Sequence, residues 1–246
     1  MKMWKRGLSI ICAAAVALGV VLAMPMHDVN AAGSVYVLVQ AKSGMGTISY
    51  SYNGDGLLKQ KDRTGDGDEH ISYVYDKKDH LKEKVYRTGA EEAHYNFTYD
   101  KKGHRTQMTS NLYGTTIVNY VNDKKGRLVQ ENWSVNSILN WMAGTYTFND
   151  KGLIASYSEK YADGYSDSVQ ILFYDGRKNL KKVEYGNRSI GYTNHYKNGR
   201  LMSRVDTDGV VTTYKYKKIY VDGKLQSRVK AQQWRLLNDK VPGELE

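Results

Sequence analysis

Pairs of adjacent lysines recur in this sequence at a nearly constant spacing and are its clearest candidates for binding chemistry. Each pair directly follows an aspartate, at Asp76, Asp100 and Asp123, which are 24 and 23 residues apart. Repeated along one edge of a sheet, such pairs would attract an anionic polymer such as teichoic acid or an acidic polysaccharide. Lysine also keeps exposed turns soluble, and we favour that simpler role. The candidate polymer-binding lysines are Lys77, Lys78, Lys101, Lys102, Lys124 and Lys125.

Tyrosine is the second residue type with two possible roles, since the chain has 21 tyrosines and only 3 phenylalanines. Rings at alternate positions of a strand lie on one face and pack across strands, while their phenol groups tolerate water. Exposed rings also stack on sugar faces, which makes Tyr75, Tyr99 and Tyr174 candidates for contact with a carbohydrate. We favour the structural role, with tyrosine as the core of a partly hydrated sheet.

Residues for catalysis or metal binding form no recognised pattern. The histidines beyond the N-terminal segment are interpreted as lying at different positions of different repeats, without zinc-ligand spacing: His70, His80, His94, His104 and His195. A segment starting at Asp62 begins like a calcium loop but has Tyr73 at its twelfth position, so an acidic hairpin turn explains it better. Neither a nucleophile elbow nor a phosphate-binding loop is present in the sequence. We therefore expect a non-enzymatic protein with no catalytic residues, cofactor or metal.

The candidate residues belong to a repeated motif that reads aromatic, any, aromatic, Asp or Asn, two residues, Gly, any, Leu. The alternating aromatics predict a strand, Asp or Asn opens a turn that Gly completes with a positive φ, and Leu begins a return strand. Leu128→Ala is accordingly expected to cost about 2 to 4 kcal/mol if Leu128 is buried. The acidic or amide anchors of the motif are Asn53, Asp76, Asp100, Asp123, Asn149 and Asp175. The strands before these turns are expected at Ile48–Tyr52, Ile71–Tyr75, Tyr95–Tyr99, Ile117–Val121, Thr145–Phe148 and Ile171–Tyr174.

The fold class predicted from this pattern is all-β: about eight antiparallel hairpins in a twisted sheet that curls on itself. The repeat domain is expected to span residues 32–229, and residues 230–246 are expected to form a polar C-terminal tail. The least regular part is the apolar connection Trp133–Gly144. Core packing is the favoured role for this connection, and plugging one end of the array or contacting a partner are the alternatives.

The repeated motif resembles the YD repeats of Rhs-type and wall-associated bacterial proteins, whose signature is close to Tyr-Asp-x-x-Gly-x-Leu. The resemblance rests on Tyr75–Leu81, Tyr99–Gly103 and Tyr174–Leu180, with weaker copies over about residues 50–226. In that family the repeats form a long antiparallel sheet that can spiral into a shell around a toxic C-terminal domain. This chain has fewer repeats than a shell needs and only a short stretch after Lys230, so the shell role is not carried over.

The N-terminus has the features of an export signal. Lys2, Lys5 and Arg6 precede an apolar run, and small residues end it near Ala31, which predicts a cleaved signal peptide at residues 1–31 rather than a retained membrane anchor. Without those residues the chain has no cysteine and a net charge of +8. A cysteine-free exported chain suits a secreted protein of a Gram-positive bacterium.

These observations together favour a secreted repeat protein that binds carbohydrate or an anionic cell-surface polymer. The alternative is a structural or protein-interaction module related to YD-repeat toxins but without a toxin domain. The expected partners are a carbohydrate, a teichoic-acid-like polyanion or a protein. Nucleic acid and a lasting membrane span are not expected.

Overall fold

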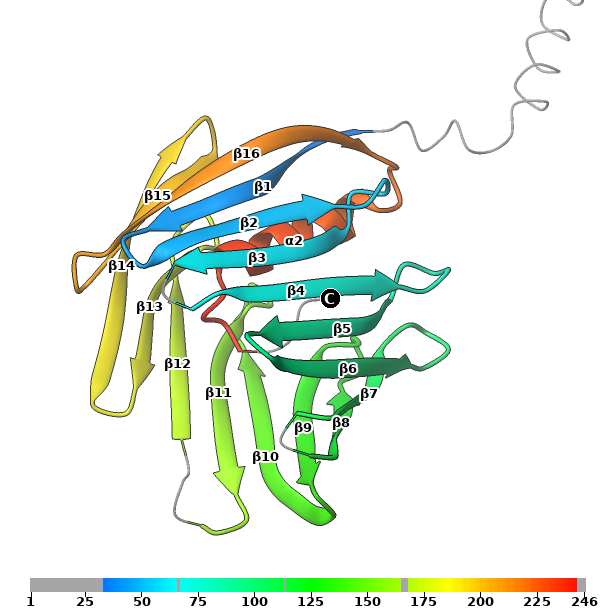
Figure 1. Cartoon of the computed structure of the whole chain (residues 1–246). Coiled ribbons are helices and arrows are strands. Elements are labelled where there is room, and N and C mark those ends of the chain that lie inside the picture. The colour runs from blue at the N-terminus through cyan, green and yellow to red at the C-terminus, as the bar shows by residue number, and fades with distance from the viewer. Residues whose placement is uncertain (1–32, 66, 113, 165–167, 243–246) are drawn as a thin grey trace, which may run out of the picture.

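A computed structural model describes residues 33–65, 67–112, 114–164 and 168–242, so the expected signal peptide lies outside the described residues. Over those ranges, sixteen antiparallel strands form one sheet that closes into a barrel, and one helix lies against its inner side (Figure 1). The elements are β1 Gly33–Ser43, β2 Gly46–Tyr52, β3 Leu58–Gly65, β4 Glu69–Tyr75, β5 Leu81–Thr88, β6 Glu91–Tyr99, β7 Arg105–Ser110, β8 Thr116–Asn122, β9 Leu128–Val135, β10 Ile138–Phe148, β11 Ile154–Tyr161, β12 Ser168–Tyr174, β13 Leu180–Tyr185, β14 Arg188–Lys197, β15 Arg200–Asp206, β16 Val211–Val221 and α2 Gln226–Leu237.

The prediction of a twisted, curled sheet of about eight hairpins is wrong, because the sheet is a closed barrel. Closure comes from β1, which precedes the first repeat and pairs with β16 from Gly33↔Val221 to Lys42↔Thr213. Strand β1 also pairs with β2, so neither end of the sheet has an unpaired edge. The repeat motif contains no information on this strand, which explains why the motif alone predicted a curled sheet but not its closure.

All six predicted strands are confirmed, and each lies within a strand that ends one residue before its anchor: β2, β4, β6, β8, β10 and β12. The turns after them also form as the motif predicts. In the β4–β5 turn, the Asp76 Oδ1 atom accepts hydrogen bonds from the backbone N–H of Lys78 at 2.7 Å and of His80 at 2.9 Å. The same two bonds recur in the turns at Asp100, Asp123, Asn149 and Asp175. We call these the anchor turns.

Histidines occupy equivalent positions in successive anchor turns, which corrects the interpretation that their positions differ. His80 and His104 each follow their aspartate by four residues, and each ring Nδ1 lies within 3.2 Å of that aspartate's Oδ2. The next turn leaves room for each ring. A Cβ on Gly103 would lie 2.9 Å from the His80 Nε2 atom, and one on Gly126 would lie 2.3 Å from that of His104. Glycine at both positions therefore leaves space for the ring and adopts the positive φ of the turn, which Asp79 and Lys178 also adopt at the equivalent position.

Most anchors follow a tyrosine whose hydroxyl has a structural role; the exceptions are Asn122 before Asp123 and Phe148 before Asn149. Next to each anchor turn the strand pairing shifts by one residue, as between Val74 and Tyr75, which marks a β-bulge. The Tyr75 hydroxyl donates to the carbonyl oxygen of Leu58, in the preceding bulge, at 2.8 Å. Equivalent bonds run from Tyr52, Tyr99, Tyr174 and Tyr216 to backbone carbonyls, and Asn122 makes one with its amide. These six bulge carbonyls are thus satisfied by side chains from the following repeats.

Tyr75→Phe should lower the free energy of unfolding by about 0.5 to 1.5 kcal/mol, because it removes this hydroxyl. Burial raises the pKa of Tyr75 to about 12, from the ordinary value of 10.0. A folded pKa above the unfolded one contributes stability that is complete below pH 10 and is lost as the pH rises toward 12. The difference between wild type and Tyr75→Phe should therefore shrink above about pH 10 in denaturant titrations. Tyr220→Phe, at an outward position, should change nothing, and an equal cost there would contradict this role.

Residues 230–246 were expected to form a polar tail, but residues up to Leu237 belong to α2, which packs inside the barrel next to the anchor turns. Gln233 Oε1 accepts the backbone N–H of Leu38 at 2.6 Å, and Gln232 Oε1 accepts that of Leu58 at 3.1 Å. These two side chains are buried, so the polar sequence of the helix reflects hydrogen bonding to the barrel wall rather than solvation. Among the described residues, no helix has the length and apolar character needed to cross a membrane.

Candidate functional site

Two adjoining cavities, of about 460 and 570 Å³, lie along the inner wall of the barrel from β6 to β13. They share Met108, Trp133, Tyr157 and Glu159, and we call them together the tyrosine chamber. The larger cavity extends to residues at the ends of β7, β9 and β11, at the end of the barrel opposite the anchor turns. Aromatic rings make up much of the lining: Tyr95, Tyr120, Trp133, Trp141, Tyr146, Tyr157, Tyr161 and Tyr185.

Two glutamates of the chamber lie on either side of a glycine. Gly144 on β10 pairs with Glu131 on β9 and with Glu159 on β11. Residues directly opposite each other project to the same face, so both carboxylates point into the chamber, with roughly 9 to 10 Å between their Cα atoms. A Cβ at residue 144 would lie 2.7 Å from the Tyr157 hydroxyl oxygen and 2.8 Å from Glu131 Oε1. Gly144 thus leaves the space in which these two groups meet.

Hydrogen bonds hold both carboxylates in place. The buried Glu131 accepts a bond from the Tyr157 hydroxyl at 2.8 Å. Glu159 Oε2 accepts one from Ser168 at 2.9 Å and one from Tyr161 at 3.2 Å. Burial, with the negative charge of Glu131 second, raises the pKa of Tyr146 and of Tyr157 well above the ordinary value. These phenols therefore remain protonated donors, and the chamber presents fixed carboxylate acceptors beside aromatic rings.

Trp141 stands at the far end of the chamber from α2. Its side chain is 39% exposed and its ring meets that of Tyr161 edge to face at 5.4 Å between centroids. The segment Trp133–Gly144, favoured as core from the sequence, forms the end of β9, a turn with positive φ at Asn136 and Ser137, and the first part of β10. Met142 is buried, whereas Ile138 and Leu139 are exposed, so this hairpin is part core and part surface.

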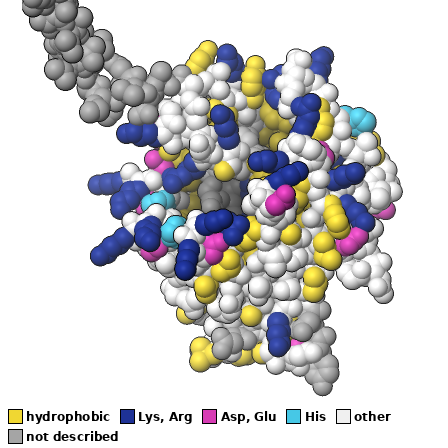
Figure 2. Space-filling model, turned by 180° about the vertical axis from the view of Figure 1, so that it is seen from behind, with side chains coloured by type: hydrophobic (Ala, Val, Ile, Leu, Met, Phe, Trp, Pro, Cys, Tyr) yellow, Lys and Arg dark blue, Asp and Glu magenta, His cyan; other side chains and the backbone are white. Residues whose placement is uncertain are grey.

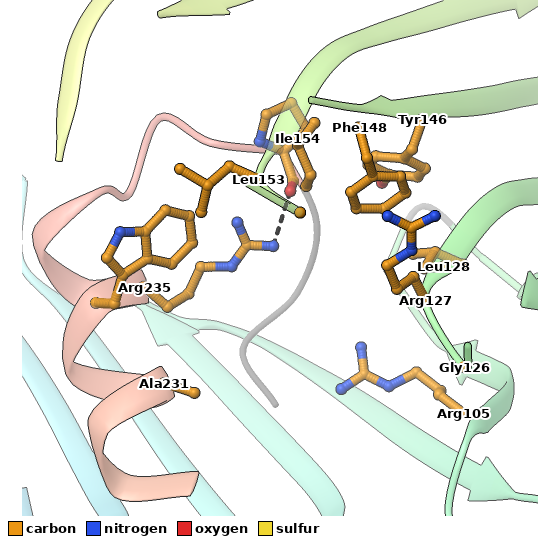
Figure 3. A pocket seen from close by; sticks show the side chains of 13 residues that line it. Arg105, Gly126, Arg127, Leu128, Tyr146, Phe148, Leu153, Ile154, Ala231 and Arg235 are labelled. Atoms are coloured by element: carbon orange, nitrogen blue, oxygen red, sulfur yellow. Dashed lines mark hydrogen bonds between the residues drawn. The ribbon is translucent and has the colours of Figure 1, made fainter. Parts of the chain in front are cut away.

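A third cavity, of about 310 Å³, lies where α2 meets the barrel wall near the anchor turns (Figure 3). It is lined by Arg105 of β7, Arg127 of the β8–β9 turn and Arg235 of α2, and we call it the arginine pocket. Arg127 stacks over Phe148 at 4.2 Å from the ring centroid. Arg235 donates to the carbonyl oxygens of Val241 at 3.1 Å and Pro242 at 2.7 Å. Apolar side chains, including Leu128, Leu153, Ile154 and Trp234, complete the lining.

The structure places the six candidate lysines together. All are exposed at the tips of three successive anchor turns, and we call them the lysine rim: Lys77, Lys78, Lys101, Lys102, Lys124 and Lys125. Figure 2 shows Lys and Arg side chains gathered, beside histidines, on the side of the molecule that carries the β4–β5 and β6–β7 turns. The six lysines therefore lie along one edge of the barrel, interspersed with the anchor aspartates of the same turns.

The candidate tyrosines do not form an open sugar-binding surface. The hydroxyls of Tyr75, Tyr99 and Tyr174 donate hydrogen bonds to backbone carbonyls of neighbouring repeats. Their half-buried rings contact the core or α2; Tyr174 lies 6.2 Å from Trp234 between ring centroids. Sequence reasoning missed Glu131, Gly144 and Glu159. The available signal was a glycine and two glutamates at inward-facing strand positions, where apolar residues are the rule.

No protein-family model matches this chain, and no curated protein matches it. Among solved structures, the chain is similar to a porin-like protein from Bacteroides uniformis ATCC 8492, with 12% identity over 76% of this chain and 98% of that one and a TM-score of 0.51. A porin-like protein from Bacteroides vulgatus ATCC 8482 follows at 11% identity, 74% and 99% coverage and a TM-score of 0.36. The structure of TcdB2-TccC3 matches at 13% identity, 76% and 11% coverage and a TM-score of 0.35.

The first of these likenesses shows a shared fold, the closed barrel. It corrects the assignment to YD or Rhs repeats that the motif suggested, since the matched architecture belongs to a porin-like protein and the repeat assignment gains no support. The repeated motif in this chain is accounted for by the anchor turns and the tyrosines that satisfy the bulges.

Proposed function

We propose that this protein is a secreted, non-enzymatic binding protein that holds a neutral or amino sugar in the tyrosine chamber. The observation that carries the proposal is the arrangement of aromatic rings and carboxylates around the two adjoining cavities of the chamber: Trp133, Tyr157, Tyr161, Glu131 and Glu159. Aromatic rings pack on the apolar face of a pyranose, and carboxylates accept hydrogen bonds from its hydroxyls. Each cavity also has a volume within the range of about 300 to 1,000 Å³ that is usual for small-molecule sites.

The charge of the chamber favours one class of sugar. Glu131, Glu159 and Asp239 line the same cavity, and Lys240 is the one lysine among its described lining residues. A uronic acid would bring another negative charge beside these carboxylates, which is unfavourable at low dielectric. A neutral sugar is free of that repulsion, and a protonated amino sugar gains attraction.

Tyr161→Ala should weaken binding of the preferred sugar by at least about tenfold, because it removes a ring from the chamber. A glycan array with neutral, amino and acidic oligosaccharides would identify the preferred sugar, and calorimetry would measure its affinity. Tyr220→Ala is the matched control, because Tyr220 is 68% exposed and does not line the chamber. The proposal would be refuted if Tyr161→Ala and Tyr220→Ala lost sugar binding equally, or if the wild-type protein bound only acidic glycans on the array. Release of reducing sugar from the bound glycan would refute its non-enzymatic part.

The lysine rim supports a second function, binding of an anionic wall polymer such as teichoic acid. Six exposed lysines on one edge would release counterions from a polyanion on binding. Replacing all six with glutamine should flatten the salt dependence of binding without changing the melting temperature, because turn tips contribute little to the core. If the wild-type protein binds no teichoic acid at low salt, the role of the lysine rim is to keep the turns soluble.

A further inference from the structure

The two cavities of the tyrosine chamber differ in the chemistry of their walls. The smaller cavity holds most of the polar groups, and four of them do not line the larger one: Glu131, Gln170, Asp239 and Lys240. Among the described lining residues of the larger cavity, the only charged one is Glu159, which both cavities share. Apolar side chains form much of the rest of that lining: Met108, Leu112, Trp133, Val135, Trp141 and Met142. The chamber therefore has a polar half and an apolar half.

Strand β9 shows the order of the two halves along the barrel. Its residues Glu131, Trp133 and Val135 are alternate positions of one strand and therefore face the same way. Glu131 lines the smaller cavity, Trp133 lines both, and Val135 lines the larger one. At about 3.3 Å per residue, the Cα atoms of Glu131 and Val135 lie roughly 13 Å apart. A ligand that spans the chamber passes from carboxylate acceptors to an apolar wall over this distance.

The apolar half reaches the surface at the β9–β10 turn, which lies at the end of the barrel away from α2 (Figure 1). Trp141 lines the larger cavity and is also exposed. Ile138, which is 57% exposed, pairs with Val135 of the cavity wall, and Leu139 beside it is exposed as well. A ligand chain longer than the cavity therefore meets further apolar surface where it leaves the barrel, and covering that surface is favourable.

We propose that the tyrosine chamber binds its sugar as part of an amphiphile, a glycoside that carries an alkyl or acyl chain. The sugar lies in the smaller cavity beside Glu131 and Glu159. The chain lies in the larger cavity against Met108, Val135 and Trp141. A free sugar would leave the apolar half facing water, whereas a chain removes that area from water. The inference rests on the sugar site proposed above and adds the class of molecule to which the sugar belongs.

Two series of probes test the inference, alkyl glucosides and alkyl glucosaminides from methyl to octyl, each used below its micelle concentration. Calorimetry should show that affinity within at least one series rises roughly threefold to fourfold with each added methylene until the cavity is filled. Trp141→Ala should lower the ratio of octyl to methyl affinity at least about tenfold, because it removes a wall of the apolar half. Leu112→Ser should lower the same ratio, and it changes a turn residue rather than a strand.

Phe173→Ala is the matched control and should leave that ratio unchanged. Phe173 is 42% exposed, close to the 39% of Trp141, but it lies on β12 and is not among the described lining residues of either cavity. Equal losses in Trp141→Ala and Phe173→Ala would overturn the inference, because the chain would then bind to general apolar surface.

The probes also separate this inference from the sugar site on which it rests. Methyl and octyl glycosides that bind with equal affinity would overturn the inference and leave the sugar site standing. Octanol that binds as tightly as the octyl glycosides would mean that the sugar contributes nothing, and it would refute the sugar site together with the inference. The absence of binding in both series would refute both as well.

Discussion

Leu180→Ala should lower the free energy of unfolding by about 2 to 5 kcal/mol, which is the usual cost of emptying a fully buried leucine site. Leu180 is 0% exposed and packs with Leu172, Val183 and Val241. Its backbone N–H also donates to Asn238 Oδ1 at 2.6 Å, so the strand and the residues that follow α2 meet at this point. The cavity left by the substitution should loosen both the wall and the end of the helix. Urea denaturation followed by tryptophan fluorescence would measure the change, because Trp234 packs against the same cluster.

Leu128→Ala is the matched control for that substitution. Leu128 has the same position in the motif, five residues after its anchor, but it is half-buried beside the arginine pocket. Its truncation should cost about 1 kcal/mol. From the sequence we expected about 2 to 4 kcal/mol on the condition that Leu128 is buried. Because Leu128 is only half-buried, the lower value replaces it. Equal costs at the two positions would show that the depth of burial of this leucine does not decide how much its truncation lowers the free energy of unfolding.

Local features of the fold were predictable from the sequence because the residues that determine each turn lie within the same repeat. Asp76 and Gly103 specify turn geometry through bonds and dihedral angles within five residues, so the hairpins could be located to within a few residues. Closure of the barrel depends instead on pairs such as Gly33↔Val221, which join distant parts of the chain. The motif says nothing of β1, and its alternating pattern is the same in an open and a closed sheet.

The candidate site was predictable only in its exposed part. Lysines at turn tips, such as Lys101 and Lys102, have few other places to point, so their shared edge followed from the period. For a tyrosine, the sequence does not distinguish a ring that faces a ligand from one whose hydroxyl satisfies a bulge. Tyr99, a candidate for carbohydrate contact, donates a hydrogen bond to the carbonyl oxygen of Leu81 at 2.7 Å. The chamber arises because closure turns one face of the sheet inward, which no single repeat encodes.

Gly144→Ala should abolish sugar binding and lower the free energy of unfolding by about 1 to 3 kcal/mol. The added methyl group would lie 2.7 Å from the Tyr157 hydroxyl oxygen and 2.8 Å from Glu131 Oε1. Both side chains would have to move apart, which breaks their 2.8 Å hydrogen bond. A buried carboxylate that loses a donor costs more than the bond itself contributes, because water does not replace the donor. Calorimetry with the preferred sugar and urea denaturation of the same variant would test both parts.

Gly191→Ala is the control for backbone effects of glycine replacement. Gly191 also lies inside a strand, β14, but the nearest atom to its added methyl would be the Thr207 Cγ2 at 3.2 Å, at the end of a side chain that can rotate. This variant should keep sugar binding and change stability by no more than about 1 kcal/mol, with stabilisation possible through a less flexible unfolded chain. If both variants bind sugar normally, the Tyr157–Glu131 pair does not position the ligand. If Gly144→Ala alone loses binding while remaining folded, the space above Gly144 belongs to the site and the glutamates beside it are its acceptors.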